Sequence, residues 1–314
     1  MGKKLLCAMI FILLPLVLGH TKEAQFKLTV GVLPILDVLP IYVAEEKGYF
    51  NASNLDVEII PCASAAERDQ LVAAGSLDVI INDLVSLALF NKERVSVIGV
   101  RYAMVPKEKF FQFAIVSSKS SNITSASDLK GVPIGISQAT IVHYLTERLL
   151  LKEGFKYEEI KTVPIPRIPD RLAALTRGEL KAACLPEPFA TLAMSMGARL
   201  ILDDRRIPTL SGSLYSVSKR LLEKNPKSVK VFLSCIDRAI TDINADKERS
   251  AKLLIEKKLI PSPLFGSYPV PEFPKPKVPE ESAWNDVIQW LSEKNLIGRF
   301  IPYSESISTQ FLKR

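Results

Sequence analysis

Histidine and cysteine, the residues most often used for metal binding and nucleophilic catalysis, are scarce in this chain. The 314 residues include two histidines and four cysteines, and no two cysteines have the spacing of a zinc site. The phosphate-binding patterns GxGxxG and GxxxxGKS/T and the hydrolase pattern GxSxG are missing. We therefore expect a binding protein with no catalytic residues, no metal and no cofactor.

Blocks of one charge sign are missing as well. The formal net charge is +7, but basic and acidic residues are interspersed and form no run of about five or six like charges. A basic patch of that kind is typical of proteins that bind nucleic acids. The charge pattern therefore predicts a solvated surface and no nucleic-acid partner.

Residues 1–19 have the pattern of a cleaved export signal. Lys3 and Lys4 precede an uncharged apolar run, Leu5 to Leu18, which ends beside Gly19 where a signal peptidase would cut. The run is short for a membrane span, although an uncleaved anchor is the alternative. No cysteine follows the run, so we expect no lipid attachment and a protein that is free in the periplasm.

The remaining cysteines, Cys62, Cys184 and Cys235, are odd in number, which argues against a disulfide framework in an exported protein. Cys62 and Cys184 each end a predicted strand. We interpret both as small buried apolar residues.

Strands and helices alternate along most of the chain. An apolar run at 28–33 predicts a strand, and the segment that opens with Pro40 and stops at Gly48 predicts a helix. Further strands are predicted at 55–61, 78–81, 95–104, 110–118, 132–136, 161–164, 180–185, 199–202 and 214–217. This alternation predicts parallel sheets with helices on both faces, whose ligands bind at the carboxyl ends of the strands.

The pattern restarts in the second half of the chain. A shift of 103 residues superposes three pairs, namely Arg68 on Arg171, Gly75 on Gly178, and Leu77 on Leu180. Together with the repeated order of elements, these matches predict two related lobes. The serine-rich stretch 117–127 is the expected first crossing between them.

We place the first lobe at residues 26–118 plus 212–314 and the second lobe at 119–211. Apolar residues at helical spacing predict a helix over 226–245. The proline-rich stretch 261–279 predicts an extended path, and a last helix over 280–294 carries both tryptophans, Trp284 and Trp290, which we interpret as core or lobe-packing residues.

Polar side chains at the carboxyl ends of the predicted strands are candidate ligand contacts. They are Asp37, Ser64, Asn82, Asp83, Ser137, Gln138, Thr140 and Glu187. Each also lies at or just before a predicted helix start, so helix capping is the alternative, and it explains Ser64 and Asn82 well. For Asp83 and Glu187 both roles stay open. His143 shares a helical face with Thr140 and Glu147, and we interpret it as an ordinary structural histidine.

Several segments resemble those of periplasmic substrate-binding proteins of ABC importers, in the NMT1/THI5-like (SsuA/THI5-like) family. These segments are GVLPILDVLPIYVAEEKGYF, CASAAERDQLVAAGSLDVIINDLVS, ISQATIVHYLTERLL, LPEPFATLA and the late YPVPEFPKP. The resemblance covers nearly all of the chain after the signal. It implies a type II periplasmic binding protein fold, with two α/β lobes that each hold a mixed, mainly parallel sheet flanked by helices. It also implies a monomer that delivers a small molecule to an ABC permease with a cytoplasmic ATPase.

The same resemblance implies which loops line the cleft. The residues are Leu36, Asp37, Leu39, Ser64, Ala65, Asn82 and Asp83 from the first lobe, and Ser137, Gln138, Ala139, Thr140 and Glu187 from the second. Opposed helix N-termini would supply amides to an anionic group, and closure of the lobes would exclude water.

The ligand class is less defined, because the family includes binders of sulfonates, nitrate and thiamine precursors. Asp37, Asp83 and Glu187 would surround the ligand with carboxylates, beside which an anion is costly to bury. This favours a ligand with N–H donors, such as an aminopyrimidine, over a sulfonate or nitrate. Two other functions remain open: an exported sensor that binds a partner protein, and a THI5-like pyrimidine-precursor synthase, whose histidine- and cysteine-rich active site this chain lacks.

Overall fold

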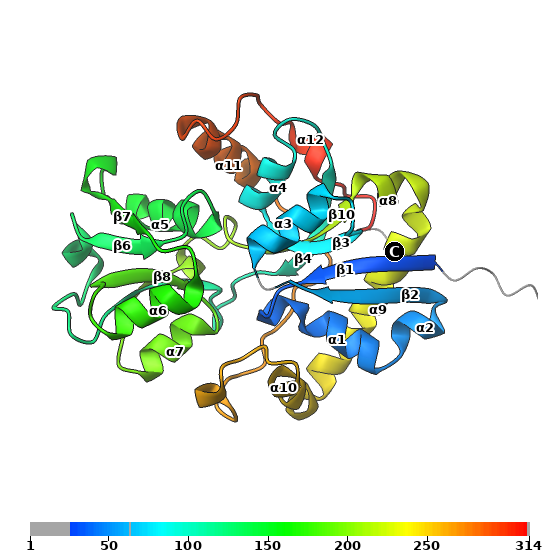
Figure 1. Ribbon diagram of the computed structural model, residues 1–314, viewed down its shortest axis with the longest axis horizontal. Helices are drawn as coiled ribbons and strands as arrows, with labels where there is room; N and C mark the ends of the chain where they lie inside the picture. Colours follow the sequence, from blue (N-terminus) through cyan, green and yellow to red (C-terminus); the bar gives the residue numbers. More distant parts are fainter. Residues whose placement is uncertain (1–25, 63, 313–314) are drawn as a thin grey trace, which may run out of the picture.

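Two separate five-stranded sheets form the centre of the computed structural model, which describes residues 26–62 and 64–312 (Figure 1). The expected export signal at 1–19 lies outside these residues. One sheet lies on the right of Figure 1, mostly in blue and cyan, and the other lies on the left, in green. Each sheet has one antiparallel strand among parallel ones. The prediction of two α/β lobes with mixed, mainly parallel sheets is confirmed.

The strands follow the predicted runs closely. In spatial order, the first sheet consists of β2 (Leu55–Pro61), β1 (Phe26–Val32), β3 (Val79–Asp83), β10 (Ser213–Ser218) and β4 (Val97–Met104). The second sheet consists of β7 (Lys161–Pro164), β6 (Pro133–Ile136), β8 (Ala182–Pro186), β5 (Phe113–Ser117) and β9 (Arg199–Asp203).

Helices flank both sheets. Those of the first lobe are the 3-10 helix η1 (Leu36–Val38), α1 (Leu39–Glu46), α2 (Tyr49–Ala52), α3 (Ala65–Ala73) and α4 (Leu84–Phe90). Those of the second lobe are η2 (Ala126–Leu129), α5 (Ile141–Lys152), η3 (Tyr157–Glu159), α6 (Ile168–Thr176) and α7 (Phe189–Ser195), and η4 (Asp204–Arg206) follows where the chain leaves this lobe. The last part of the chain contains α8 (Lys219–Lys224), α9 (Pro226–Ala245), α10 (Lys247–Glu256), η5 (Ser262–Leu264), α11 (Glu281–Glu293) and α12 (Tyr303–Ser306).

The chain crosses between the lobes earlier than we predicted from the serine-rich stretch 117–127. Strand β5 pairs with β8 and β9, so it belongs to the second sheet and the first crossing is residues 105–112. The serines instead form a local turn, in which Ser117 donates to the carbonyl of Ile123 and Ser121 to that of Ser118. Our lobe boundary at 118/119 was therefore too late. The second crossing, residues 204–212, connects β9 to β10.

The repeat in the sequence corresponds to a repeat in hydrogen bonding. The Arg68 guanidinium donates through Nη1 to the carbonyl of Ile81 at 2.9 Å, and Arg171 donates through Nε to the carbonyl of Cys184 at 2.9 Å. The two carbonyls are separated by the same 103 residues as the two arginines. Each buried arginine therefore ties a helix to the next strand of its own lobe, at the equivalent place.

Substitution of Arg171 by Met should lower the free energy of unfolding by about 2 kcal/mol, because buried carbonyls lose a charged donor. Besides Cys184, Arg171 donates to the carbonyl of Ile165 at 2.7 Å. Urea unfolding measures the loss. Arg177→Met, at the carboxyl end of the same helix and exposed, should change stability by less than about 0.5 kcal/mol. Equal losses in the two variants would contradict the assigned role of Arg171.

The end of the chain packs against both lobes. Helix α9 has the bounds predicted for it and lies along α1, with Phe232 against Tyr215 of the first sheet. Helix α11 completes an apolar core that also contains residues of α4 and α5, and thus of both lobes. Trp284 and Trp290 of α11 are fully buried in this core, so their interpretation as packing residues is confirmed.

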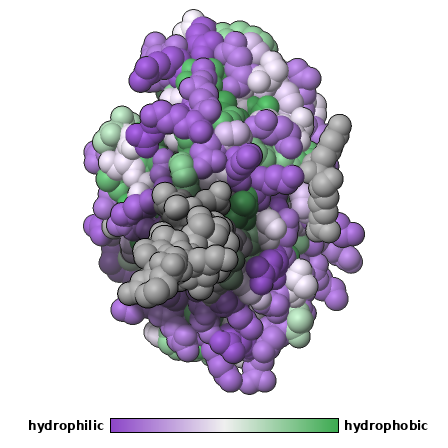
Figure 2. All heavy atoms as spheres, turned by 90° about the vertical axis from the view of Figure 1, so that its right-hand side faces the viewer, coloured by the Kyte–Doolittle hydropathy of each residue, from purple (hydrophilic) through white to green (hydrophobic). Residues whose placement is uncertain are grey.

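The three cysteines of the described chain, Cys62, Cys184 and Cys235, are buried, as interpreted for the first two. Among the described residues, no helix is long and apolar enough to cross a membrane. Figure 2 views the first lobe from the right-hand side of Figure 1. There the described residues are mostly hydrophilic, with hydrophobic ones in small separate areas. The described residues visible in this view therefore form no broad apolar patch.

Candidate functional site

The loop after β1 contributes one buried carboxyl group. Asp37 lies in η1, and its side chain is buried, with 7% exposed. Its neighbours Leu36 and Leu39 are also buried, in the apolar core of the first lobe. Burial raises the pKa of Asp37, an effect that the nearby Ser213 hydroxyl partly offsets. Of the three contacts expected from this loop, only Asp37 therefore presents a polar group, and the two leucines support it from the core.

Asn82 and Asp83 at the end of β3 have different roles. Asp83 caps α4, since its Oδ1 accepts from the amide of Ser86 at 2.8 Å. Asn82 was a candidate ligand contact with helix capping as the alternative; it does not cap, because it remains in the strand, and its Oδ1 accepts from the Ser216 hydroxyl at 2.7 Å. Its Nδ2 has no partner among the described residues although the side chain is buried. Asn82 therefore offers a free amide donor near the carboxyl end of β3.

Ser64 and Ala65 lie at the start of α3. The Ser64 hydroxyl accepts from the amide of Glu67 at 3.1 Å, so the predicted capping role of Ser64 is confirmed. Both Ser64 and Ala65 are exposed. The first turn of α3 is therefore accessible to solvent.

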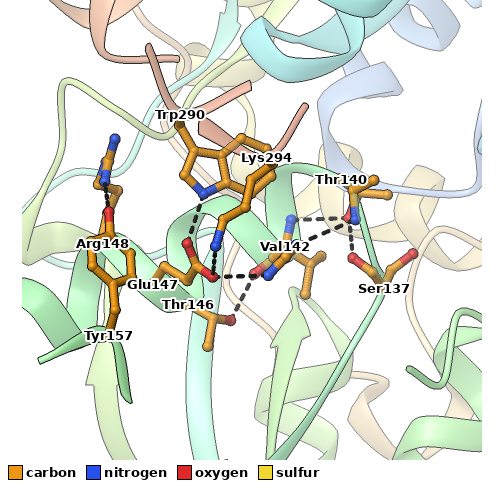
Figure 3. A network of polar contacts seen from close by, with 11 residues as sticks. Ser137, Thr140, Val142, Thr146, Glu147, Arg148, Tyr157, Trp290 and Lys294 are labelled. Carbon is orange, nitrogen blue, oxygen red and sulfur yellow. Dashed lines mark hydrogen bonds and ion pairs between the residues drawn. The ribbon is translucent and has the colours of Figure 1, made fainter. Parts of the chain in front are cut away.

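The loop Ser137–Thr140 follows β6 in the second lobe. Thr140 caps α5 by accepting from the amide of Val142 at 3.2 Å, and it donates to the carbonyl of Ser137 at 2.8 Å (Figure 3). Ala139 has a φ of +58°, a left-handed conformation that is uncommon for a residue with a Cβ. Gln138 is exposed and the other three residues are half-buried. Local hydrogen bonds therefore fix this loop in an unusual backbone shape.

Glu187 lies directly after β8, and its carboxylate is already engaged. The hydroxyl of Thr191 donates to both carboxylate oxygens at 2.9 Å, and the amide of Thr191 donates to Oε1 at 3.1 Å. The hydroxyl of Tyr268 donates to Oε2. Burial raises the pKa of Glu187 to about 6, although these hydrogen bonds act in the opposite direction. Glu187 therefore satisfies the first turn of α7 and also contacts the last part of the chain.

Tyr268, which we did not select from the sequence, lies where the two lobes meet. It comes from the proline-rich stretch and bonds Glu187 of the second lobe. Burial, together with the charges of Glu187 and, least of all, Asp37, raises the pKa of Tyr268 well above its usual range. Tyr268 thus links the carboxyl end of β8 to the apolar core of the first lobe. Its only signal in the sequence was its place in YPVPEFPKP.

A second residue that the sequence did not reveal joins the two crossings. Asp204 is fully buried and accepts from the amide of Gln112 at 3.0 Å, while Ser211 lies near its other side. Gln112 belongs to the first crossing, and Asp204 and Ser211 belong to the second. Burial raises the pKa of Asp204 to about 7.

This arrangement offers hydrogen-bond donors and acceptors to a ligand but no nucleophile paired with a base. His143, the histidine among the described residues, is buried. Its two ring nitrogens are hydrogen-bonded to the Ala139 amide and to Glu147. No group of three or more potential metal ligands occurs among residues 26–62 and 64–312.

Comparisons with known proteins show which family this chain resembles. Residues 36–250 match the family described as NMT1/THI5 like. A protein of Escherichia coli named as an aliphatic sulfonates-binding protein is 26% identical over 154 residues, which is 49% of this chain and 48% of that protein. The chain thus matches about half the length of this relative. An enzyme, 4-amino-5-hydroxymethyl-2-methylpyrimidine phosphate synthase THI13 of Saccharomyces cerevisiae, is 25% identical over 70% of this chain and 67% of its own length.

Solved structures share the fold. The periplasmic aliphatic sulphonate binding protein SsuA of Escherichia coli superposes with a TM-score of 0.77 at 18% identity, covering 90% of this chain and 92% of that chain. This likeness identifies the fold as that of a type II periplasmic binding protein. With the family match over more than half of its residues, the chain belongs to the NMT1/THI5-like family.

Proposed function

We propose that this protein is a periplasmic solute-binding protein of an ABC importer. As a monomer, it would capture a small molecule between its lobes and deliver it to permease subunits that are driven by a cytoplasmic ATPase. The observation that carries the proposal is the bond from Tyr268, which packs in the core of the first lobe, to Glu187 at the carboxyl end of a strand of the second lobe. Ligands of open α/β sheets bind at such strand ends.

We propose a sulfonate-type anion as the first ligand class. Our argument against anions counted three free carboxylates, but Asp83 and Glu187 are engaged at helix starts. The free Nδ2 of Asn82 and the accessible first turn of α3 are donors suited to an oxyanion. A relative named for aliphatic sulfonates supports this class. An aminopyrimidine is the second class, supported by the buried Asp37 carboxyl, which would accept from ring or amino N–H groups.

A thermal-shift screen of protein stripped of carried-over ligand tests the proposal. Methanesulfonate, MOPS, nitrate and aminopyrimidines form the panel. A ligand at about a hundredfold excess over its Kd should stabilise the protein by about 2.7 kcal/mol. The shift with sulfonates should disappear in Asn82→Ala and persist in Asn244→Ala, an exposed control. A shift with aminopyrimidines alone, lost in Asp37→Asn, would assign the second class, and no shift with either class would contradict both.

We further propose that the chain is not an enzyme, despite the THI13 relative. In the described chain, His143 is held by two hydrogen bonds and the cysteines are buried, which leaves neither residue type poised for catalysis. An exported sensor is the remaining alternative. Uptake of the bound solute by the permease in proteoliposomes, dependent on this protein and ATP, would separate import from sensing.

A further inference from the structure

A buried carboxylate links α5 of the second lobe to α11. Glu147 on α5 accepts from Trp290 Nε1 at 2.8 Å, from Lys294 Nζ at 2.6 Å and from His143 Nε2 at 3.0 Å (Figure 3). Burial alone would raise the pKa of Glu147, but these hydrogen bonds lower it to about 2. The carboxylate therefore stays ionised and accepts from three donors, two of which belong to α11 or its end.

The partners of His143 define its tautomer. An ionised Glu147 can only accept, so Nε2 of His143 carries the proton that faces it. The other ring nitrogen, Nδ1, accepts from the amide of Ala139 at 3.4 Å and must therefore be unprotonated. The ring is buried, and its centroid lies 5.2 Å from that of Trp290, in an edge-on contact. His143 thus connects the carboxylate of Glu147 to the backbone of the loop Ser137–Thr140.

The loop end of this connection is an uncommon backbone conformation. A left-handed φ at a residue with a Cβ persists only where surrounding contacts hold it. At Ala139 these contacts are the His143 ring on its amide and the bond between Thr140 and Ser137 beside it. The loop is therefore held partly from within and partly from α5.

The α11 end of the connection is fixed to both lobes. Asp286 of α11 accepts from Tyr144 and Arg148 of α5, in the second lobe, at 2.5 and 2.7 Å. The chain after α11 is bound to the first lobe, where Asn91 Nδ2 donates to the Ser306 hydroxyl at 2.9 Å and Arg299 donates to the carbonyl of Asn91 at 2.9 Å. The position of α11 thus depends on how the two lobes are placed.

We propose that His143 is a positioning residue that couples α11 to the loop Ser137–Thr140 through Glu147. The tautomer set by Glu147 presents Nδ1 to Ala139, and α11 sets the place of Glu147. Removal of either α11 donor therefore loosens a loop that it does not touch. The role of this loop in ligand capture rests on the proposed function, but the coupling itself does not.

Hydrogen exchange of the Ala139 amide tests the coupling without any ligand. Glu147→Gln keeps the size of the side chain, but one amide oxygen cannot accept from all three donors. The Ala139 amide should exchange at least about fivefold faster in Glu147→Gln and in Lys294→Met. The matched control is Glu293→Gln, which removes an exposed charge from the same helix next to Lys294. Its Ala139 amide should exchange at the wild-type rate.

Nitrogen NMR of the His143 ring gives a second readout, and wild-type protein should show a protonated Nε2 and a bare Nδ1. A protonated Nδ1 would overturn the proposal. So would unchanged exchange at Ala139 in both variants, or an equal acceleration at Ala183 in the core of the second lobe, which would indicate only global loss of stability.

Methanesulfonate titration is a separate experiment that tests the ligand class. If it binds wild-type protein, its Kd should rise at least about threefold in Glu147→Gln and stay unchanged in Glu293→Gln. If it binds neither, the proposed ligand class fails while the exchange result still decides the coupling.

Discussion

Replacement of Trp290 by Ala should lower the free energy of unfolding by about 4 kcal/mol. Removal of a fully buried aromatic side chain typically costs about 3–5 kcal/mol, through lost apolar contacts and the cavity that remains. Trp290 has no exposed surface and lies in the core shared by α4, α5 and α11. The substitution also removes one of the three donors to the buried Glu147 carboxylate. Urea unfolding at pH 7 measures the effect.

A matched variant separates packing from hydrogen bonding at this position. Trp290→Phe keeps much of the ring but removes the indole N–H, so its loss should be about 2 kcal/mol, the size of one hydrogen bond to a charged group plus a small cavity. A loss below about 1 kcal/mol in Trp290→Ala would contradict the placement of α11 in a core common to both lobes. In that case the two lobes would be joined by their crossings alone.

The parts of the fold that depend on neighbouring residues were predictable from the sequence. The strand β2 and the helix α9 have the predicted bounds, and Ser64 and Thr140 cap the helices that follow them. A cap and an amphipathic period are set within a few residues, so their signals lie in short windows. The repeat of Arg68 and Arg171 could be predicted for another reason, because the two lobes use the same residue at equivalent positions.

The assignment of β5 to the second sheet was not predictable in this way. Its alternating apolar residues fit either sheet, and the choice depends on pairing with β8 and β9, about 70 and 85 residues further along the chain. The serine-rich stretch looked like a linker because serine is common in linkers. In this protein its hydroxyls instead satisfy carbonyls in a compact turn.

In the candidate site, too, local signals in the sequence predicted some features, and others depend on residues far apart in the chain. Asp83 and Glu187 were equally suited to capping and to ligand contact, and only the positions of Ser86 and Thr191 show that their oxygens are engaged. Asp204 carried no local signal and Tyr268 only its place in YPVPEFPKP, because the importance of both comes from groups that lie far away in the sequence. Buried polar residues of this kind need the tertiary structure to be recognised.

The stability of the protein should fall as pH rises from 4 to 8, and Asp204 should account for the largest part of the fall. Its pKa is raised from 3.8 to about 7 because the carboxyl group is buried. The folded protein therefore retains a proton that the unfolded chain has already lost over this range. Stability from this source is complete below pH 4 and is lost as pH rises through about 7. The difference between the two pKa values corresponds to about 4 kcal/mol.

Asp204→Asn should remove this pH dependence, because the amide resembles the protonated carboxyl and never ionises. At pH 8 the variant should be more stable than wild type by up to about 4 kcal/mol, whereas at pH 4 it should show no advantage. Subtraction of the stability curve of the variant from that of wild type leaves the contribution of Asp204 alone, without that of Glu187, whose pKa is also raised, to about 6.

Asp128→Asn gives a control of opposite sign, since hydrogen bonds from Thr124 and Ser125 lower the pKa of that carboxyl. That variant should be less stable than wild type at neutral pH. A flat difference curve for Asp204→Asn would mean that the carboxyl between the two crossings is solvated. A stability difference that grows from about pH 4 and levels off near pH 7 would instead place a buried proton at the joint on which any movement of the lobes depends.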